Sequence, residues 1–274
     1  MKTRAAIALT IAGSDSGGGA GVQADIKTFS ALGVYGTSVI TALTAQNTQG
    51  VQGIFDVPAS FVELQIESIF NDLVPQSVKL GMLSRADIIL SVAKCLTYFK
   101  AKNIVFDPVM VATSGDALLQ ADAVKSLKSA LFPLAAIITP NLQEAAVLLN
   151  EPIAVSEQDM EQQALRLVDM GARAVLIKGG HLEGAYGTGK ESVDILVING
   201  QIQRLSSLRI KTHNTHGTGC TLSSAIAAYL SQGFDLSEAV RHAKTYVTGA
   251  IRAADSLCIG HGNGPTHHFF KWWK

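Results

Sequence analysis

The chain has no excess charge of either sign and few charged residues altogether. Its 274 residues include 22 lysines and arginines against 22 aspartates and glutamates, and charged residues make up only 16% of the chain. A surface that binds the phosphate backbone of nucleic acids needs clustered positive charge, and disordered chains combine high charge with low hydrophobicity. The composition therefore argues against nucleic acid as a partner and predicts a folded globular protein.

Cysteine is scarce, and long apolar runs are absent from the sequence. The three cysteines, Cys95, Cys220 and Cys258, form no C-x-x-C pair, which argues against a disulfide framework or a zinc site. No apolar stretch reaches the roughly 20 residues that span a bilayer. Basic residues before the apolar residues 5–12 resemble a secretion signal, but this run has the length and β-branched content of a buried strand. We therefore expect a cytoplasmic protein without membrane contact.

No internal repeat or Pro/Ser-rich linker divides the chain, so we expect a single domain over residues 1–274 without a separate lid domain. Hydrophobic residues make up 47% of the sequence and recur as short strand-like runs that alternate with amphipathic helices. The predicted strands span residues 5–12, 38–45, 51–57, 77–80, 103–106, 135–138, 174–177, 192–197 and 202–208. The predicted helices span residues 21–32, 60–72, 84–100, 122–131, 142–149, 157–170, 218–231 and 236–255. Asn199 and Gly200 predict a hairpin with a type I′ turn between the last two strands, at an edge of the sheet.

Strands that alternate with helices predict an α/β fold, in which a mostly parallel sheet carries helices on both faces. In such sheets ligands bind beyond the carboxyl ends of the strands. The residues that follow the predicted strands include backbone donors, carboxylates, amides and a lysine. They are residues 13–19, 46–48, 81–82, 107–110, 139–141 and 178–181. We therefore expect the functional site at this edge of the sheet.

A glycine-rich turn, HGTGCT over residues 216–221, opens the predicted helix at 218–231. A helix start offers unpaired N–H groups and a positive dipole end, which favour a bound phosphate. A cysteine in the first helical turn should have its thiolate favoured, so that Cys220 can accept a proton near neutral pH. By itself, Cys220 also fits an inert residue packed where the helix crosses the sheet.

The chain resembles the hydroxymethylpyrimidine/phosphomethylpyrimidine kinases of thiamine biosynthesis, a branch of the ribokinase-like superfamily. The resemblance runs from LTIAGSDSGGGAGVQAD over residues 9–25 to GNGPTHH over residues 262–268, which is nearly the whole chain. Most ribokinase-like enzymes carry an aspartate at the end of the glycine-rich turn, whereas this branch carries a cysteine, as at Cys220. The resemblance implies a three-layer αβα ribokinase-like fold, ATP and Mg²⁺ as cofactors, and a homodimer.

The implied reaction transfers the γ-phosphoryl group of ATP to the hydroxymethyl oxygen of the aminopyrimidine, and a second group to the resulting monophosphate. Phosphoryl transfer needs mainly positioning and charge stabilisation. On this basis Cys220 takes the proton of the attacking hydroxyl, while the N–H groups of Gly217, Thr218 and Gly219 stabilise charge on the transferred group. Thr218 is also expected to contact the nucleotide. The second transfer needs no strong base, because its acceptor is a phosphate oxygen.

Further residues are assigned to the nucleotide and the metal. In the N-x-x-E segment that starts with Asn141, the resemblance implies that Asn141 contacts the nucleotide and that Glu144 orders Mg²⁺ and its waters, although both residues also fit a plain helix cap. Lys178 follows a strand and is expected to reach the ATP phosphates. Lys244 resembles a position near the nucleotide but also fits a solvated lysine. Asp107 would be costly to bury unpaired, which favours a role beside a metal or a phosphate.

For the pyrimidine, Gln46 is the strongest predicted contact, because one amide offers both a donor and an acceptor to the ring edge. Asp25 matches a substrate-side position in the family, although it also fits first-turn helix electrostatics. Gly13 is expected on the same side. Met82 and Val109 are expected to supply apolar walls or backbone contacts.

Other motifs are interpreted as structural or as covers. The loop over residues 13–19 lacks the lysine of a P-loop and is predicted to be a flexible cover of the substrate. GHGNG over residues 260–264 imitates a dinucleotide fingerprint, but it follows a helix and lacks the strand-turn-helix context. His261, His267 and His268 have no acidic or cysteine partner spaced for a metal. The aromatic tail after them is predicted to be structural, and a contact with another subunit is one role considered for it.

Two competing functions remain at this point. A pyridoxal kinase phosphorylates a hydroxymethyl group with much the same apparatus, although Gln46 and the small cover loop favour the pyrimidine. A non-catalytic pyrimidine- or nucleotide-binding module predicts ligand binding without release of ADP, and Cys220, Glu144 and Lys178 argue against it.

Overall fold

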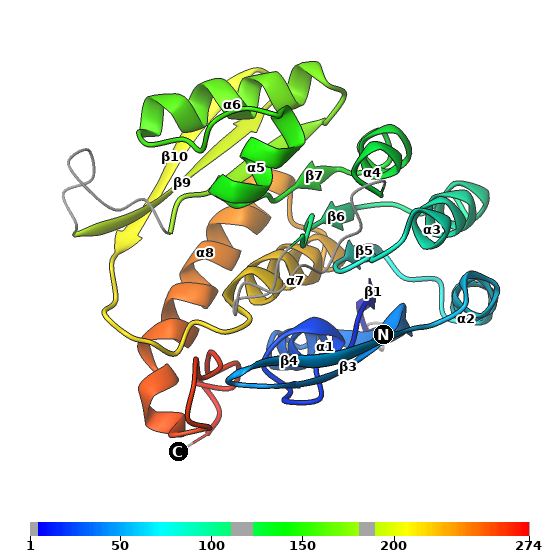
Figure 1. Cartoon of the computed structure of the whole chain (residues 1–274), viewed down its shortest axis with the longest axis horizontal. Helices are drawn as coiled ribbons and strands as arrows, with labels where there is room; N and C mark the ends of the chain where they lie inside the picture. Colours follow the sequence, from blue (N-terminus) through cyan, green and yellow to red (C-terminus); the bar gives the residue numbers. More distant parts are fainter. Residues whose placement is uncertain (1–4, 111–122, 181–189, 274) are drawn as a thin grey trace.

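In the computed structural model, which describes residues 5–110, 123–180 and 190–273, an eight-stranded sheet forms the centre of the molecule (Figure 1). The strands follow the order β10-β9-β8-β7-β6-β5-β1-β2. Strands β8 to β2 pair in parallel, whereas β9 and β10 are antiparallel to their neighbours. The bounds are β1 Ile7–Ala12, β2 Tyr35–Ile40, β5 Ser77–Leu80, β6 Ile104–Phe106, β7 Ile137–Ile138, β8 Ala174–Lys178, β9 Glu191–Ile198 and β10 Gln201–Leu208.

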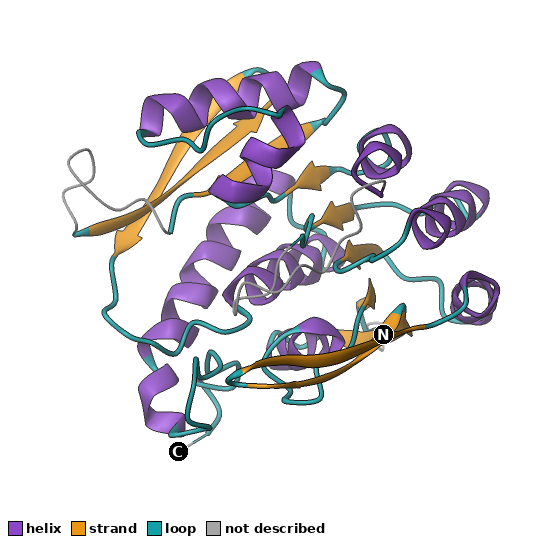
Figure 2. Ribbon diagram, viewed as in Figure 1, coloured by secondary structure: helices purple, strands orange, loops and turns teal. Residues whose placement is uncertain are grey.

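Helices cover both faces of this sheet, which completes the three layers (Figure 2). One face carries α2 (Ala59–Phe70), α3 (Ala86–Tyr98), α4 (Ala123–Leu131), α5 (Leu142–Leu149) and α6 (Glu157–Asp169). The opposite face carries α1 (Gly21–Ala31), α7 (Thr218–Ser231) and α8 (Leu236–Arg252), which is followed by a short 3₁₀ helix (Ala254–Leu257). The α/β fold that the sequence predicts is confirmed.

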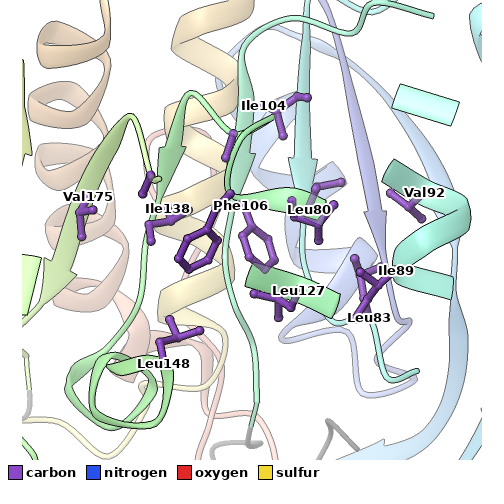
Figure 3. Close-up of a cluster of buried hydrophobic side chains, with 14 of the residues drawn as sticks. Leu80, Leu83, Ile89, Val92, Ile104, Phe106, Leu127, Ile138, Leu148 and Val175 are labelled. Carbon is purple, nitrogen blue, oxygen red and sulfur yellow. The ribbon is translucent and has the colours of Figure 1, made fainter. Parts of the chain in front are cut away.

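Alternating residues of the central strands supply two separate apolar cores. In β6, Ile104 and Phe106 belong to the core under α2 to α6, while Val105 belongs to the core under α7 and α8. This alternation follows from the strand geometry, in which successive side chains point to opposite faces. Figure 3 shows side chains of the first core, which come from β5, β6, β7 and β8 and from the helices that cover them.

A second, two-stranded sheet was not expected. The sequence analysis predicts one strand over residues 38–45, but the chain leaves the main sheet at Thr41, after β2. It then forms β3 (Ala42–Asn47), which pairs with β4 (Gly50–Asp56) in an antiparallel hairpin. At the break the N–H of Thr41 donates to Ala12 O at 3.0 Å, and its hydroxyl donates to Met82 O at 2.8 Å. These contacts are tertiary, so the local pattern of residues could not reveal them.

Most predicted elements agree with the structure to within a few residues. Strand β5 and helices α5 and α7 have the predicted bounds. Asn199 and Gly200 have φ values of 51° and 73°, as a type I′ turn requires, and their hairpin ends the sheet at β10. The predicted last helix stops at Arg252 rather than at residue 255. The predicted helix start at residue 122 and the end of the predicted loop at residue 181 lie outside the described residues. Among those that are described, no helix is long and apolar enough to cross a membrane.

Candidate active site

The predicted site residues lie where the parallel strands end. Gly13, Gly81, Asp107, Thr139 and Gly179 directly follow β1, β5, β6, β7 and β8. Because these strands are parallel neighbours, their carboxyl ends lie along one edge of the sheet. The hydroxyl of Ser223 in α7 donates to Asp107 at 3.2 Å and joins this edge to that helix, so residues far apart in the sequence form one site.

The glycine-rich turn at the start of α7 is packed against the glycine-rich loop of residues 13–19. Gly217 caps α7 with φ at 77°, and a Cβ atom there would overlap the carbonyl oxygen of Gly19. The N–H of Thr218, one of the predicted donors, already donates to Thr215 O at 3.2 Å. Within the described residues, the N–H groups of Gly217, Gly219 and Cys220 have no protein acceptor. The start of α7 therefore offers a set of free donors to an anion.

The prediction that the thiolate of Cys220 is favoured is wrong for this arrangement. Burial raises the pKa of the Cys220 thiol to about 11, and the negative charges of Asp25 and Asp107 act in the same direction. The positive charge of Lys79 and the N–H of Gly21 oppose this rise without cancelling it. A sequence motif shows the helix start, but it does not show the two carboxylates that the fold brings near the sulfur.

Asp25 lies beneath the turn in a fully buried polar cluster. Its carboxylate accepts hydrogen bonds from Lys79 at 2.8 and 3.0 Å, Thr10 at 2.6 Å and Ser224 at 2.5 Å. Neither Asp25 nor Lys79 has any exposed surface. Ser224 lies one helical turn after Cys220, so the cluster supports the same face of α7. This position gives no support to the predicted contact of Asp25 with a substrate, which stays a prediction.

Lys79 is a site residue that the sequence analysis missed. It lies in β5, where each of the four residues is buried. Burial disfavours the charged form of Lys79, but the negative charges of Asp25 and Asp107 outweigh it and raise the pKa of Lys79 above its usual range. A lysine inside a short, otherwise buried strand needs a charged partner. That requirement is the signal that could have identified it.

Lys178 and Asp107 form an ion pair beside the glycine-rich turn. The Lys178 Nζ atom lies 2.7 Å from Asp107 Oδ1 and 3.8 Å from Glu144 Oε2. Asp107 also accepts hydrogen bonds from Thr139 at 3.1 Å and from Ser223 of α7 at 3.2 Å. The structure therefore brings together three predicted residues, one lysine and two carboxylates.

Gly219 leaves room for this lysine. A Cβ atom at Gly219 would lie 3.2 Å from Lys178 Nζ and 3.7 Å from Asp107 Oδ2. The first turn of α7 thus lies close to the ion pair, and a side chain at residue 219 would press on Lys178. Lys178 and the free N–H groups of the turn can act on the same anion.

Asn141 and Glu144 form a capping box at the start of α5. The Asn141 side chain accepts from Glu144 N at 2.8 Å, and Glu144 Oε2 accepts from Asn141 N at 2.7 Å. Burial raises the pKa of Glu144 to about 7, and the negative charge of Asp107 adds to this rise while Lys178 opposes it. Asn141 and Glu144 therefore form the helix cap that the sequence analysis gave as the alternative. Their roles at the nucleotide and the metal stay predictions.

The carboxylates at this edge can be compared with the ligands that a bound Mg²⁺ would need. Both predicted carboxylate ligands already accept bonds from the protein, Asp107 from Thr139, Lys178 and Ser223, and Glu144 from Asn141 N. Magnesium in nucleotide sites keeps several waters and takes one or two carboxylates together with substrate phosphates. Among the described residues, no group of three or more acidic, histidine or cysteine side chains is arranged to hold a metal ion. These residues fit an ion held mainly through phosphates and water.

Lys244 pairs with a carboxylate that the sequence analysis did not single out. Its Nζ atom lies 2.7 Å from Asp194 Oδ2, and Asp194 Oδ1 accepts from Gly179 N at 3.0 Å. Asp194 lies in β9, opposite Lys178 of β8. Lys244 is therefore neither isolated nor freely solvated, because it is tied to the end of β8.

The predicted pyrimidine contacts gather around the end of β1 and the β3–β4 hairpin. A Cβ atom at Gly13 would lie 3.2 Å from Met82 Sδ, so these two residues are in contact. Ser16 of the glycine-rich loop donates to Gln46 O at 2.8 Å and accepts from Gln46 N at 2.9 Å. Val109 is half-buried, and its N–H donates to Asp107 O at 2.8 Å.

Asp15 organises the glycine-rich loop of residues 13–19. Its carboxylate accepts the N–H groups of Gly17 at 2.8 Å, Gly19 at 3.0 Å and Ala20 at 2.8 Å. His216 Nε2 lies 2.8 Å from Asp15 Oδ2, which joins the loop to the residue before the glycine-rich turn. Because these N–H groups are occupied, they are not available as a phosphate cradle. The predicted role of the loop as a flexible cover stays untested.

The C-terminal aromatic residues pack against the chain itself. Phe269 and Phe270 join the core under α7 and α8, and a Cβ atom at Gly249 would lie only 2.5 Å from the ring of Phe270. The indole N–H of Trp272 donates to Ala31 O at 3.1 Å. This packing agrees with a structural role for the tail, while its predicted contact with another subunit stays untested.

The family model described as phosphomethylpyrimidine kinase matches residues 15–267. A hydroxymethylpyrimidine/phosphomethylpyrimidine kinase from Rhizobium meliloti is 56% identical over 98% of this chain and 99% of its own length. The enzyme of that name from Escherichia coli is 50% identical over 97% of this chain and 98% of its own.

Solved structures of two kinds of kinase superpose on this chain. A phosphomethylpyrimidine kinase from Clostridium difficile superposes with a TM-score of 0.78 at 44% identity, covering 90% of this chain and 99% of that chain. A pyridoxal kinase from Staphylococcus aureus in complex with ADP superposes with a TM-score of 0.89 at 32% identity, covering 98% and 96% of the two chains. The fold is thus shared with both kinds of kinase, while the higher sequence identities are to phosphomethylpyrimidine kinases.

Proposed function

The chain belongs to the phosphomethylpyrimidine kinase family, and on this premise we propose that it uses ATP to phosphorylate 4-amino-5-hydroxymethyl-2-methylpyrimidine and then its monophosphate, in thiamine biosynthesis. The observation that carries the proposal is the meeting of Lys178, Asp107 and the free N–H groups of α7 beside Cys220. Phosphoryl transfer depends mainly on positioning and on charge stabilisation, and this arrangement can supply both. The cytoplasm is the proposed compartment.

The N–H groups of Gly217, Gly219 and Cys220 and the ammonium of Lys178 would stabilise the charge that develops on the transferred group. Such preorganised donors are typically worth about 100- to 1000-fold in turnover each. They need no rearrangement during the reaction, because α7 and β8 hold them in place. Lys244, which is tied to Asp194 near the end of β8, remains a proposed neighbour of the nucleotide.

Cys220 would accept the proton of the attacking hydroxymethyl group. Because burial raises the pKa of its thiol to about 11, the thiolate is a minor form at neutral pH. A loose transition state demands little bond formation to the attacking oxygen, so a small thiolate fraction is sufficient. The thiolate fraction grows with pH below 11, so the first phosphorylation should accelerate from pH 7 to pH 9. The second phosphorylation starts from a phosphate oxygen and should lack this rise.

When bound, Mg²⁺ would neutralise part of the charge of the ATP phosphates. Glu144 is the proposed residue on the metal side, acting through water, with Asp107 holding Lys178 beside it. Asn141 keeps the Glu144 carboxylate in position through the capping box and is proposed to lie near the nucleotide.

The proposal is tested by measuring ADP release with the hydroxymethylpyrimidine, its monophosphate and pyridoxine as acceptors. We expect both pyrimidines to be used, and we expect Cys220→Ala to reduce the first phosphorylation far more than the second. Equal losses in the two steps would contradict the role of Cys220 as the base. Ligand binding without release of ADP would contradict the proposed activity as a whole.

A second candidate function is phosphorylation of vitamin B6. Solved pyridoxal kinases superpose well on this chain, with TM-scores of 0.87 for the enzyme from Bacillus subtilis and 0.89 for that from Staphylococcus aureus in complex with ADP. A higher kcat/KM for pyridoxine than for the hydroxymethylpyrimidine in the same assay would favour this candidate.

A further inference from the structure

The GHGNG segment near the C-terminus has no part in the proposed phosphoryl transfer, yet it contacts both sides of the candidate site. We call residues 260–266 the strap. It follows the 3₁₀ helix after α8 and runs past the turn of the β3–β4 hairpin to the start of α7. Its contacts at the two ends differ in kind, and each involves a residue within two positions of a proposed active-site residue.

At the hairpin the strap holds a single residue, Thr48, which lies two positions after Gln46. The Thr48 hydroxyl accepts from His261 N at 3.3 Å and from Gly262 N at 3.2 Å. The Thr48 carbonyl accepts from Asn263 N at 2.9 Å. The strap therefore donates three successive backbone N–H groups to the turn that carries Gln46.

Gly260 and Gly262 of the strap are explained by these contacts. A Cβ atom at Gly260, which has φ at 77°, would overlap the side chain of Thr48. A Cβ atom at Gly262 would overlap the carbonyl oxygen of Thr48. The strap approaches the hairpin closely because these two positions have no side chain, which accounts for the fingerprint-like spacing without a dinucleotide.

At the other end the strap binds the residue before the glycine-rich turn. His216 N donates to Gly264 O at 3.0 Å, and Thr266 N donates to His216 O at 3.3 Å. His216 and Pro265 thereby form a short parallel bridge, and Gly217 follows His216 directly. One segment thus connects the hairpin of Gln46 to the proposed phosphate site.

Two contacts described above close this connection into a ring. His216 bonds to Asp15, and Ser16 bonds to the backbone of Gln46. The path therefore runs from His216 through the glycine-rich loop to Gln46, on to Thr48, and back along the strap. A closed ring of hydrogen bonds fixes the hairpin relative to α7 more firmly than either path alone, because the hairpin turn is held from two directions.

We propose that the strap is a positioning element that sets the place of Gln46 relative to the turn of Gly217 and Cys220, and so governs binding of the acceptor. The inference rests on the proposed function, since it assigns Gln46 to the acceptor. Thr48 acts through Gln46 and is a positioning residue. Opening the ring at Thr48 should weaken acceptor binding and leave nucleotide binding intact, because Lys178 is held by Asp107 and Glu144 and not through Thr48.

The first test compares substitutions of Thr48. Thr48→Val removes the hydroxyl that accepts two N–H groups, whereas Thr48→Ser keeps it. Since each lost bond is worth roughly a few-fold to tenfold, we expect Thr48→Val to raise the KM for the hydroxymethylpyrimidine about tenfold. The KM for ATP should change less than about twofold, and Thr48→Ser should behave as the unaltered protein.

The second test uses two pairs of glycine substitutions. Gly260→Ala is matched by Gly200→Ala, because the two glycines have φ values of 77° and 73° but nothing lies within 4 Å of a Cβ atom at Gly200. Gly262→Ala is matched by Gly53→Ala, which adds a methyl group to the same hairpin at ordinary contact distance. We expect the strap variant of each pair to raise the acceptor KM and its control to leave it unchanged. Equal effects within both pairs would overturn the proposal.

Hydrogen–deuterium exchange of residues 43–50 supplies a readout that does not depend on turnover. Exchange there should be faster in Gly262→Ala and Thr48→Val than in their controls, while global stability is followed by thermal unfolding. If the unaltered protein phosphorylates no pyrimidine, the proposed function fails, and the exchange data still decide whether the strap holds the hairpin. If the protein is active but both the acceptor KM and the exchange are insensitive to Thr48→Val and Gly262→Ala, the strap proposal alone is overturned.

Discussion

Single residues with buried charge determine much of the chemistry at the carboxyl edge of the sheet. Lys79 and Asp25 are fully buried and satisfy each other, with Thr10 and Ser224 completing the bonds of the carboxylate. Such a pair contributes little net stability compared with apolar residues of the same size, but removing one partner leaves a buried charge without compensation. The pair therefore behaves as a unit, and its value to the site lies in the charge that Lys79 presents below Cys220.

Lys79→Met should destabilise the protein by about 3–5 kcal/mol, because Asp25 then remains buried and unpaired. The double variant Lys79→Met with Asp25→Asn removes both charges and should recover a large part of this loss. The free energy of unfolding from urea titrations measures both variants. If the effects of the two substitutions simply add, the ion pair does not form as described.

The pH dependence of stability should reveal Glu144. Burial raises its pKa from the ordinary 4.5 to about 7, so between these values the unfolded chain releases a proton that the folded protein retains. The unfolded state then binds fewer protons, and this contribution to stability declines as pH rises from 4.5 to 7. Glu144→Gln keeps an acceptor for Asn141 N but cannot ionise, so its melting temperature should decline less than that of the unaltered protein. Parallel declines would contradict the raised pKa.

At the scale of elements, the glycines at the start of α7 avoid steric overlap with neighbouring segments. Gly217 meets the loop of residues 13–19, and Gly219 meets Lys178. Helix propensity alone favours alanine over glycine by about 1 kcal/mol. The glycines of this turn are therefore explained by close approach and not by helix formation.

Gly219→Ala should separate the effect of close approach on turnover from the effect of helix propensity on stability. The new Cβ atom would lie 3.2 Å from Lys178 Nζ, so the ammonium must shift, and we expect turnover to decrease about tenfold or more, within the range of losses for a displaced donor. Thermal stability should stay the same or increase slightly, because alanine is the better helix former. A measurement of kcat together with the melting temperature tests this, and unchanged turnover would argue against Lys178 as a donor to the transferred group.

The strap and the β3–β4 hairpin are elements whose importance comes from their contacts. Neither belongs to the eight-stranded sheet, and each has few buried side chains. Their relative position depends on hydrogen bonds that backbone N–H groups donate to a residue more than 200 positions away, such as the bond from Gly262 N to the Thr48 hydroxyl at a separation of 214. Substitutions in either element should therefore affect substrate binding more than global stability.

At the scale of the whole molecule, the outer face of the hairpin exposes large apolar side chains. Leu43 and Phe55 lie directly opposite each other in the β3–β4 ladder and are 48% and 68% exposed. Contiguous exposed apolar surface of this kind is typical of a protein interface. The homodimer implied by the family resemblance stays a prediction, and this face is where we expect it to form.

Phe55→Asp should reduce self-association without unfolding the chain, because the side chain is mostly exposed in the single chain. Light scattering after size-exclusion chromatography should show twice the chain mass for the unaltered protein and a lower average mass for Phe55→Asp. Leu208→Asp, which replaces an equally exposed residue at the far end of the sheet, provides the control. A monomer at all concentrations would contradict the predicted homodimer.

The alternation of helices and strands could be predicted because it depends on local periodicity. Residues 142–149 and 218–231 form helices with the predicted bounds, and Asn199 and Gly200 form the predicted turn. The break at Thr41 could not be predicted, since residues 38–45 contain no glycine or proline that would signal it. What ends β2 there is a set of contacts with Ala12 and Met82, which come from other strands and loops.

By itself the sequence determined the order of the elements, the fold class and the edge of the sheet that carries the candidate site, because hydrophobic periodicity and turn residues act over a few neighbouring positions. Only the tertiary structure decided which buried charges meet, how firmly Cys220 holds its proton, and that the C-terminal glycines reach Thr48. The physical reason is that desolvation and Coulomb interactions depend on distances in space. His216 and Asp15 lie 2.8 Å apart in the fold but 201 positions apart in the chain.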